Sequence, residues 1–303
     1  MTTQDKGLLK SESQASLSIT TPSSISHTPG RGAPLFTPPK QSFLAIRGGI
    51  TSLQTIYLGI AGVIIWLGLW ELLHYLTPGA QQKFLPGPGQ VISKIFYLIE
   101  EKEYFGDIGK SLFRIYMSFT VACLVAIPIG LLMGSFVRVQ ALLNPIMGGW
   151  RYLPAASFVP LLLVYFGPTD TSKMALLFLG CVFFLIALIL DDVLSVPKEL
   201  IESAQTMGAD RLHIVCKVIF PAAAPKILDS MRNMIAVSWT YLVIAEIVAA
   251  TDGIGAVMMR ASRFLHVDTI MAGILTIGIL GVLTDVIFRR AGHHLFPHNR
   301  IGQ

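Results

Sequence analysis

The amino-acid sequence predicts an all-α membrane protein, a bundle of about six transmembrane helices with a helical cytoplasmic loop between the fourth and fifth spans. Hydrophobic residues make up 53% of the 303 residues and charged residues 14%, whereas about a quarter of the residues in a soluble domain are charged. The mean hydropathy of the chain is +0.64. Its apolar runs are long and continuous, which favours helices over the alternating strands of a membrane barrel.

Six apolar runs approach the roughly 20 residues that a helix needs to cross a hydrocarbon core of about 30 Å. They cover about residues 55–77, 111–136, 142–166, 173–191, 229–250 and 269–289. The third run holds Arg151 and three prolines, so we expect it to be kinked or partly re-entrant. Lys and Arg are more frequent in the loops that share a side with the two termini, which places both termini in the cytoplasm.

The ends of the chain differ in composition from the middle. Residues 1–47 are rich in Ser, Thr and Pro and contain no apolar run long enough for a secretory signal. We predict a disordered cytoplasmic tail there. A plastid transit peptide is the alternative, because the segment is poor in acidic residues and rich in hydroxyl groups. Residues 48–295 then form the transmembrane domain and residues 296–303 a short cytoplasmic tail.

Several classes of function are disfavoured by the residue content. Cys123 and Cys181 fall within spans and Cys216 in a cytoplasmic loop, so no disulfide or metal spacing is present. The net charge of +5 suits basic inner loops, and no basic run is interleaved with aromatic residues as in a nucleic-acid-binding protein. The phosphate-binding pattern G-x-x-x-x-G-K-[ST] does not occur. We therefore expect no cofactor and no ATP hydrolysis in this chain.

A polar stretch, ESAQTMGADRLHIVCKVIFP, separates the fourth and fifth apolar runs. Just before it, Ser195 is expected to cap a helix that has Pro197 in its first turn. Gly208 suits a left-handed turn at the end of that helix. Asp210 is then expected to cap a second short helix, which the Phe-Pro pair at Pro221 ends. The pattern predicts two short helices with an apolar face toward the membrane and a polar face toward a soluble partner.

The same stretch resembles the EAA motif of permeases in binding-protein-dependent ABC importers. Glu202, Ser203 and Ala204 take the places of the three residues that give the motif its name. Gly208 takes the place of its glycine, Ile219 that of its isoleucine and Pro221 that of its final proline. Ser203 and Phe220 depart from the motif, and the interval between Gly208 and Ile219 is one residue longer than in its usual form.

Other segments are similar to the nitrate, sulfonate, taurine and bicarbonate branch of these permeases. Together they cover about residues 55–295, and they read FLPGPGQVISKIF, GKSLFRIYMSF, NPIMGGWRYLPAASFVPLLLVYFG, AEIVAATDGIG and GILGVLTDVIF. The resemblance implies a bacterial plasma-membrane protein in which two permease subunits, here a homodimer, form the pore. It also implies an external substrate-binding protein and two cytoplasmic ATPase subunits, which bind ATP and Mg²⁺.

In this family the helix at the EAA loop fits a groove on each ATPase subunit and transmits force to the pore. For Glu202 the resemblance implies a charge contact to the ATPase, and the alternative is a solvated residue near a helix end. The residues implied in the coupling contact are Glu202, Ser203, Ala204, Gly208, Ala209, Asp210, Arg211 and Pro221.

Ionisable residues within spans indicate a transport path, because charges are costly in hydrocarbon. Arg151 either lines the path of an anion or holds the kinked third span by bonding to carbonyl groups or a carboxylate. A direct pair of Arg151 with Glu246 is not expected, because at 1.5 Å per residue their depths differ by about 12 Å. The candidate residues of the path are Trp150, Arg151, Tyr152, Trp239, Thr240, Tyr241 and Glu246.

The substrate is expected to be a small inorganic oxyanion. The run SWTYLVIAEIVAATDGIG resembles nitrate and bicarbonate permeases more than sulfonate permeases, so nitrate or nitrite is the first candidate. Bicarbonate, a sulfonate or taurine are the alternatives. An ATP-independent channel or carrier, and a membrane-embedded enzyme, are alternatives of another class. They are disfavoured because the chain has an amphipathic cytoplasmic loop and few intramembrane carboxylates or catalytic groups.

Overall fold

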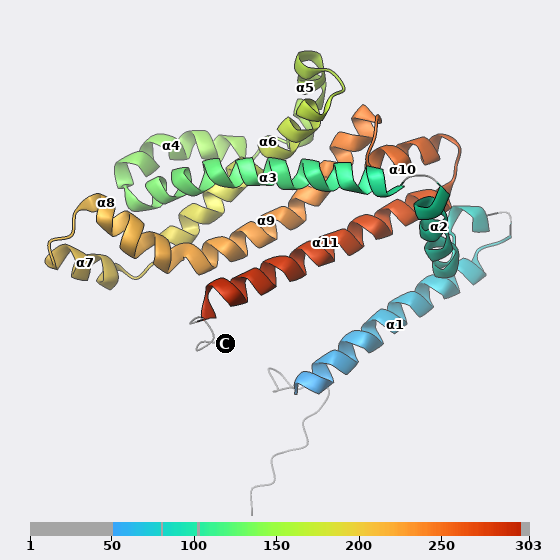
Figure 1. Cartoon of the computed structure of the whole chain (residues 1–303), viewed down its shortest axis with the longest axis horizontal. Coiled ribbons are helices and arrows are strands. Elements are labelled where there is room, and N and C mark those ends of the chain that lie inside the picture. Colours follow the sequence, from blue (N-terminus) through green and yellow to red (C-terminus); the bar gives the residue numbers. More distant parts are fainter. Residues whose placement is uncertain (1–50, 80, 102–103, 298–303) are drawn as a thin grey trace, which may run out of the picture. The chain divides into compact units, whose positions relative to one another are not determined.

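The computed structural model describes residues 51–79, 81–101 and 104–297, and the regular structure in these ranges is helical (Figure 1). The predicted tail at 1–47 and nearly all of the predicted tail at 296–303 lie outside the described residues. The chain divides into one unit that ends at Tyr57 and a second that runs from Leu58 to the C-terminus. Within the first unit, Thr51 and Gln54 begin a helix with reciprocal hydrogen bonds of 3.1 and 3.4 Å.

The second unit holds nearly all of the described helices. The α-helices of the chain are α1 (Ser52–Leu76), α2 (Pro88–Glu101), α3 (Tyr104–Ser135), α4 (Val137–Trp150), α5 (Val159–Phe166), α6 (Asp170–Leu194), α7 (Lys198–Thr206), α8 (Arg211–Ile214), α9 (Phe220–Ala249), α10 (Ile254–Arg263) and α11 (Val267–Leu295). Two short 3₁₀ segments, Gln82–Phe84 and Ala155–Phe158, and a π-helical segment, Val215–Ile219, complete the described helical structure.

Four described helices are long and apolar enough to cross a membrane: α1, α3, α6 and α11. The helix that leads into and includes α9 forms a fifth candidate span together with α10, with a bend of 51° between them. The predictions of helices over the first, second, fourth, fifth and sixth apolar runs are therefore confirmed.

The third apolar run is broken, as its prolines predicted. It consists of α4, a 3₁₀ segment and α5, and the backbone is extended at Pro154 between the two parts (φ −65°, ψ 116°). Proline lacks an N–H donor and disfavours helical geometry in the residue before it, so a helix ends readily at such a position. Pro160 instead lies in the first turn of α5, where a proline is tolerated.

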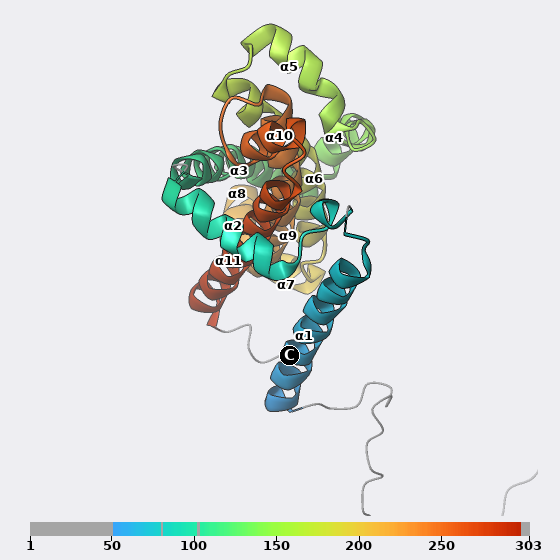
Figure 2. The same ribbon diagram turned by 90° about the vertical axis from the view of Figure 1, so that its right-hand side faces the viewer.

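The long helices α3, α6 and α9 pack along one another, with α6 between α3 and α9, and α11 packs along α9 (Figures 1 and 2). Glycines allow α3 to lie close to α6. A Cβ atom added at Gly134 would lie 2.6 Å from the Cβ of Val193, and one added at Gly130 would lie 2.8 Å from that of Ile189. Small residues at such positions are what close helix packing in membranes requires.

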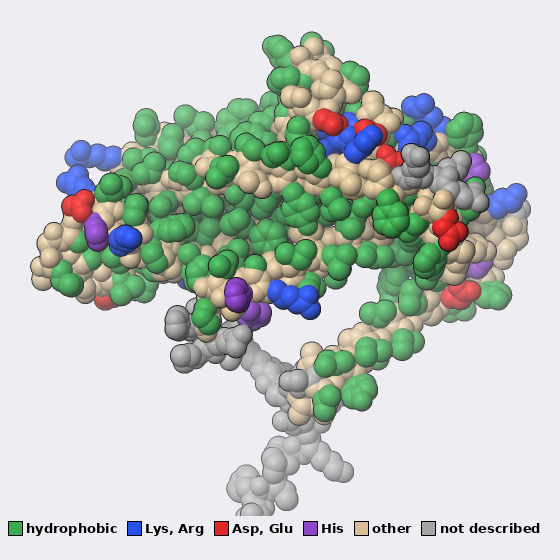
Figure 3. All heavy atoms as spheres, in the orientation of Figure 1, with side chains coloured by type: hydrophobic (Ala, Val, Ile, Leu, Met, Phe, Trp, Pro, Cys, Tyr) green, Lys and Arg blue, Asp and Glu red, His purple; other side chains and the backbone are tan. Residues whose placement is uncertain are grey.

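The surface agrees with a protein that lies in lipid. Figure 3 shows hydrophobic side chains over the middle of the helices and charged side chains mainly toward helix ends. Leu124 of α3 and Ile279 of α11 are among many large apolar residues that are exposed on the surface of the chain. A soluble protein rarely exposes so large an apolar area, so these faces are suited to lipid or to other subunits.

Candidate functional site: the coupling loop and a buried ionic cluster

The loop between α6 and α9 contains the two short helices that the sequence predicted, α7 and α8. Gly208 joins them with a left-handed backbone (φ +81°), and nothing lies within 4 Å of a Cβ atom built at this position. Asp210 occupies the N-cap position of α8 with an extended backbone, although its side chain makes no capping hydrogen bond. The predicted glycine turn is thus confirmed. Glycine is favoured at position 208 by the left-handed backbone and not by a lack of space for a side chain.

Two details of the predicted loop are wrong. Pro197, not Ser195, is the N-cap of α7; Ser195 ends α6, where its hydroxyl donates to the carbonyl oxygen of Asp192 at 2.6 Å. Pro221 does not end a helix either. The chain passes from α8 through the π-helical segment directly into α9, and Pro221 lies in the first turn of α9, where its missing N–H is tolerated.

The loop between α6 and α9, named the coupling loop here for the role that the EAA motif implies, exposes a mixed set of polar and apolar side chains. Ser203 and Thr206 turn their hydroxyl groups back onto the carbonyls of Glu199 and Glu202, at 2.7 and 2.9 Å. Ala204 and Ala209 pack against the hydrophobic core. The remaining residues predicted to contact an ATPase are exposed, namely Glu202, Gly208, Asp210, Arg211 and Pro221. The loop is therefore anchored by its alanines and open on its charged side.

A cavity of about 370 Å³ lies beside α6 and α9, near the end of α4. Of the predicted path residues, Arg151 and Tyr241 line it. The cavity also has an acidic and an amide side chain that sequence reasoning missed, Asp191 and Asn233. Both are polar residues near the ends of apolar runs, which is the signal that would have found them.

The other predicted path residues lie elsewhere. Trp150 stacks on Phe158 and Phe183, with ring centroids 5.5 and 4.5 Å apart, and Tyr152 is exposed. Trp239 is buried, and the hydroxyl of Thr240 donates to the carbonyl oxygen of Val237.

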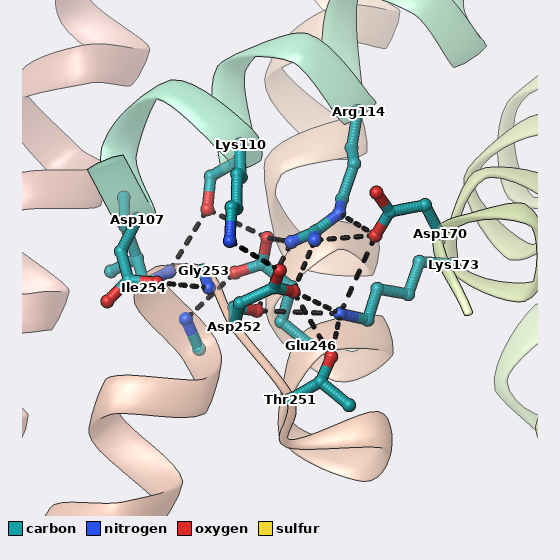
Figure 4. A network of polar contacts seen from close by, with 12 residues as sticks. Asp107, Lys110, Arg114, Asp170, Lys173, Glu246, Thr251, Asp252, Gly253 and Ile254 are labelled. Carbon is teal, nitrogen blue, oxygen red and sulfur yellow. Dashed lines mark hydrogen bonds and ion pairs between the residues drawn. The ribbon is translucent and has the colours of Figure 1, made fainter. Parts of the chain in front are cut away.

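Glu246 belongs to a buried ionic cluster rather than to the cavity (Figure 4). Its carboxylate is 1% exposed and accepts hydrogen bonds from Arg114 at 2.9 Å, from the hydroxyl of Ser111 at 2.7 Å and from the backbone N–H of Gly255 at 2.9 Å. A Cβ atom at Gly253 would collide with this carboxylate. As expected from depth, the described partner of Glu246 is not Arg151.

Arg114 lies at the centre of the cluster and is fully buried. Besides Glu246, its guanidinium donates to Asp170 at 2.6 and 2.9 Å and to the side chain of Asp252. It also donates to the carbonyl oxygen of Asp252 at 3.2 Å. A planar group with five donors is suited to join three carboxylates that come from α6, α9 and the loop after α9.

Asp252 lies in the loop between α9 and α10 and receives two lysines as well. Lys173 of α6 and Lys110 of α3 bind its two carboxylate oxygens at 2.8 and 2.9 Å. Partial burial alone would raise the pKa of the Asp252 carboxyl. The hydrogen bonds from Lys173, Lys110 and Arg114 outweigh this effect, so the pKa lies below its usual range.

Asp107 of α3 fixes the other side of the same loop. Its carboxylate accepts a hydrogen bond from the backbone N–H of Gly253 at 2.8 Å and lies 3.6 Å from a guanidinium nitrogen of Arg260 in α10. The ionic cluster, defined as Asp107, Lys110, Arg114, Asp170, Lys173, Glu246, Asp252 and Arg260, therefore pairs carboxylates with cations from α3, α6, α9, α10 and the loop after α9.

The fold and the loop define a multi-span membrane protein with an exposed helical element on one side. Comparison with known proteins agrees. Residues 126–300 match the family described as binding-protein-dependent transport system inner membrane component. The chain is 33% identical over 253 residues to the taurine transport system permease protein of Escherichia coli strain K12, covering 80% of this chain and 90% of that protein.

The chain therefore belongs to the family of binding-protein-dependent transport system inner membrane components. It is also 26% identical to the bicarbonate transport system permease protein of Synechococcus elongatus, with 77% of this chain and 87% of that protein covered. An inward-facing structure of the MetNI methionine ABC transporter has the same fold, with a TM-score of 0.55, 19% identity, and coverage of 67% of this chain and 96% of that chain. The resemblance in the sequence is thus confirmed.

Proposed function

We propose that this chain is the permease subunit of an ATP-driven importer for small substrates that carry a monovalent oxyanion group, with a sulfonate such as taurine as the first substrate to test. The exposed pair of short helices on either side of Gly208 carries the first half of this proposal, because it offers a soluble motor a surface between two long spans. The substrate half is supported by 33% identity to a taurine permease, against 26% to a bicarbonate permease. This order moves nitrate, the first candidate from the sequence, behind a sulfonate and bicarbonate.

The proposed assembly has a second copy of this chain, two ATPase subunits that bind ATP and Mg²⁺, and an external substrate-binding protein. The residues proposed to contact the ATPase are those predicted from the EAA motif, with Glu202 and Arg211 exposed to offer charge. The protein then lies in a bacterial inner membrane with both termini in the cytoplasm, on the same side as α7 and α8.

The fold offers a path for mechanical coupling. α7 follows α6 directly, and α8 continues through the π-helical segment into α9. α6 begins, and α9 ends, at the ionic cluster, so both helices connect the coupling loop to the opposite end of the bundle. At 1.5 Å per residue that distance is about 35 Å. A movement of α7 and α8 is therefore expected to reach the loop that carries Asp252.

Uptake into proteoliposomes tests this proposal. We expect the chain, reconstituted with its ATPase and binding protein, to accumulate labelled taurine only when ATP is supplied, and to prefer taurine over bicarbonate and nitrate. Uptake without ATP or without the ATPase subunit would contradict the proposed function. ATP-dependent uptake of bicarbonate or nitrate alone would keep the permease and overturn the sulfonate.

A further inference from the structure

Three cations on two long helices converge on a single loop carboxylate, that of Asp252. Lys110 and Arg114 belong to α3 and Lys173 to α6, and all three contact this carboxylate. The loop that carries Asp252 has left-handed backbone at Ala250 (φ 43°) and Gly253 (φ 96°). The cations are thus held by packed helices, whereas the anion lies on a short irregular segment between α9 and α10.

We propose that the ionic cluster is a binding site for the anionic group of the transported substrate, and that Asp252 occupies this site in the conformation seen here. The inference rests on the proposed function, since it gives the imported oxyanion a place to bind. Beyond that function, Lys110, Arg114 and Lys173 are proposed to bind the anion and Asp252 to compete with it.

The charge balance of the cluster limits when the loop can leave. If the loop withdraws, Arg114 still has Glu246 and Asp170 as partners. Among the described residues, Lys173, which is 1% exposed, then keeps only Asp170 at 3.9 Å, because the hydroxyl of Thr251 that it contacts at 2.6 Å leaves with the loop. A buried ammonium without a close counter-charge is strongly unfavourable. The loop is therefore expected to leave only when another anion replaces Asp252.

The anion that replaces Asp252 must match the charge of the carboxylate that leaves. One carboxylate carries one negative charge, so a monovalent oxyanion restores the balance: a sulfonate, bicarbonate or nitrate group. The two lysines already bind two different oxygens of Asp252, at 2.8 and 2.9 Å, which suits a group with several equivalent oxygens. The positive charges and the competing carboxylate together select for such an anion.

The ionic cluster is accessible from the surface and lies far from the coupling loop. The side chain of Asp252 is 26% exposed and that of Lys110 is 55% exposed, so the cluster opens to the surface on this side. It lies at the start of α6 and the end of α9, away from α7 and α8. In the proposed orientation this is the external side, where a binding protein would deliver its anion.

A purely structural cluster predicts a different result when Asp252 loses its charge. We expect Asp252→Asn, in the assembled transporter in detergent, to acquire a site for ethanesulfonate, a monovalent sulfonate without an amine. At about ten times its Kd, the anion is expected to raise the midpoint of thermal unfolding by about 3–6 °C. The unsubstituted protein should respond much less, because its own carboxylate competes.

Asp268→Asn is the matched control. Asp268 also pairs with a lysine, Lys94 at 3.1 Å, but it lies on α11 outside the ionic cluster. It should show no added response to ethanesulfonate at constant ionic strength. Adding Lys173→Gln to Asp252→Asn should abolish the response. An equal shift in both asparagine variants, or none in Asp252→Asn, would overturn the proposal.

Lys110→Gln gives a second measurement if Asp252→Asn does not fold. This side chain is largely exposed, so the variant is expected to fold and to need about tenfold more substrate for half-maximal uptake. Unchanged half-saturation would contradict the site. Failure of the site and failure of the proposed function remain distinct. Normal uptake, with no thermal shift in Asp252→Asn and unchanged half-saturation in Lys110→Gln, would contradict only the proposed anion site. Binding of ethanesulfonate without any ATP-driven uptake would contradict only the proposed function.

Discussion

Replacing Arg114 with methionine is expected to lower the free energy of unfolding by about 3–5 kcal/mol, because it leaves the buried carboxylate of Glu246 without its counter-charge. Glu246 is affected most, since it is 1% exposed and Arg114 is its one described ion-pair partner. Methionine keeps an unbranched apolar chain in the core, so the loss reports the charge and its hydrogen bonds. Thermal or denaturant unfolding of the purified protein measures it.

Arg289→Met is the matched control for this prediction. Arg289 is an exposed member of α11 that pairs with Asp285 at 2.7 Å, and Asp285 keeps Arg232 as a second partner. Exposed pairs contribute little to stability, so this variant should unfold close to the unsubstituted protein. Combining Arg114→Met with Glu246→Gln should recover part of the loss, because the buried charge is removed with its partner. Equal stability of Arg114→Met and Arg289→Met would contradict the role given to the cluster.

Gly208→Val is expected to reduce ATP-driven uptake by more than about tenfold while the protein still folds and inserts. Valine at φ +81° costs about 1–2 kcal/mol in backbone energy, so the turn between α7 and α8 is expected to change direction. No atom lies within 4 Å of the new Cβ, so the effect does not come from a clash. Uptake and ATP hydrolysis, measured on the same reconstituted sample, should become uncoupled.

Gly208→Asn separates backbone geometry from side-chain size. Asparagine adopts left-handed backbone more readily than other residues with a side chain, so this variant should keep much of the uptake. If asparagine and valine reduce uptake equally, the left-handed turn is not what the coupling loop requires. If valine has no effect, α7 and α8 do not transmit force through this turn.

The helices could be predicted from the sequence because hydropathy is a local property. The length and hydropathy of each apolar run indicate that it lies in lipid, and the prolines of the third run predict that its helix is broken. The turn at Gly208 could likewise be predicted from the residues around it. The error at Pro221 came from helix continuity, since a π-helical segment lets α8 run on into a proline that a sequence pattern takes for a stop. At Ser195, α6 continues as far as Leu194, so the serine ends this helix and does not cap the next one.

The ionic cluster could not be predicted in the same way. Its residues come from helix ends that are far apart in the chain: Arg114 bonds to Asp170, Glu246 and Asp252, which follow it by 56, 132 and 138 residues. Such pairs depend on how α3, α6 and α9 pack, and the spacing of residues within one helix does not predict them. Glu246 was recognised as unusual because it lies within an apolar run. Arg114 lies within the second run, 111–136, so the same signal would have marked it, but the pairing of the two residues follows only from helix packing.

Site-directed crosslinking tests whether α7 and α8 contact an ATPase subunit. Cys216 is the exposed cysteine and is first replaced by serine, while Cys123 and Cys181 are buried. A cysteine is then placed at Gln205, exposed on α7, or at Arg263, exposed at the end of α10. Crosslinking to the ATPase from position 205 and not from position 263 is the predicted result. A transport-active complex that crosslinks from 263, or fails to crosslink from 205, would contradict it.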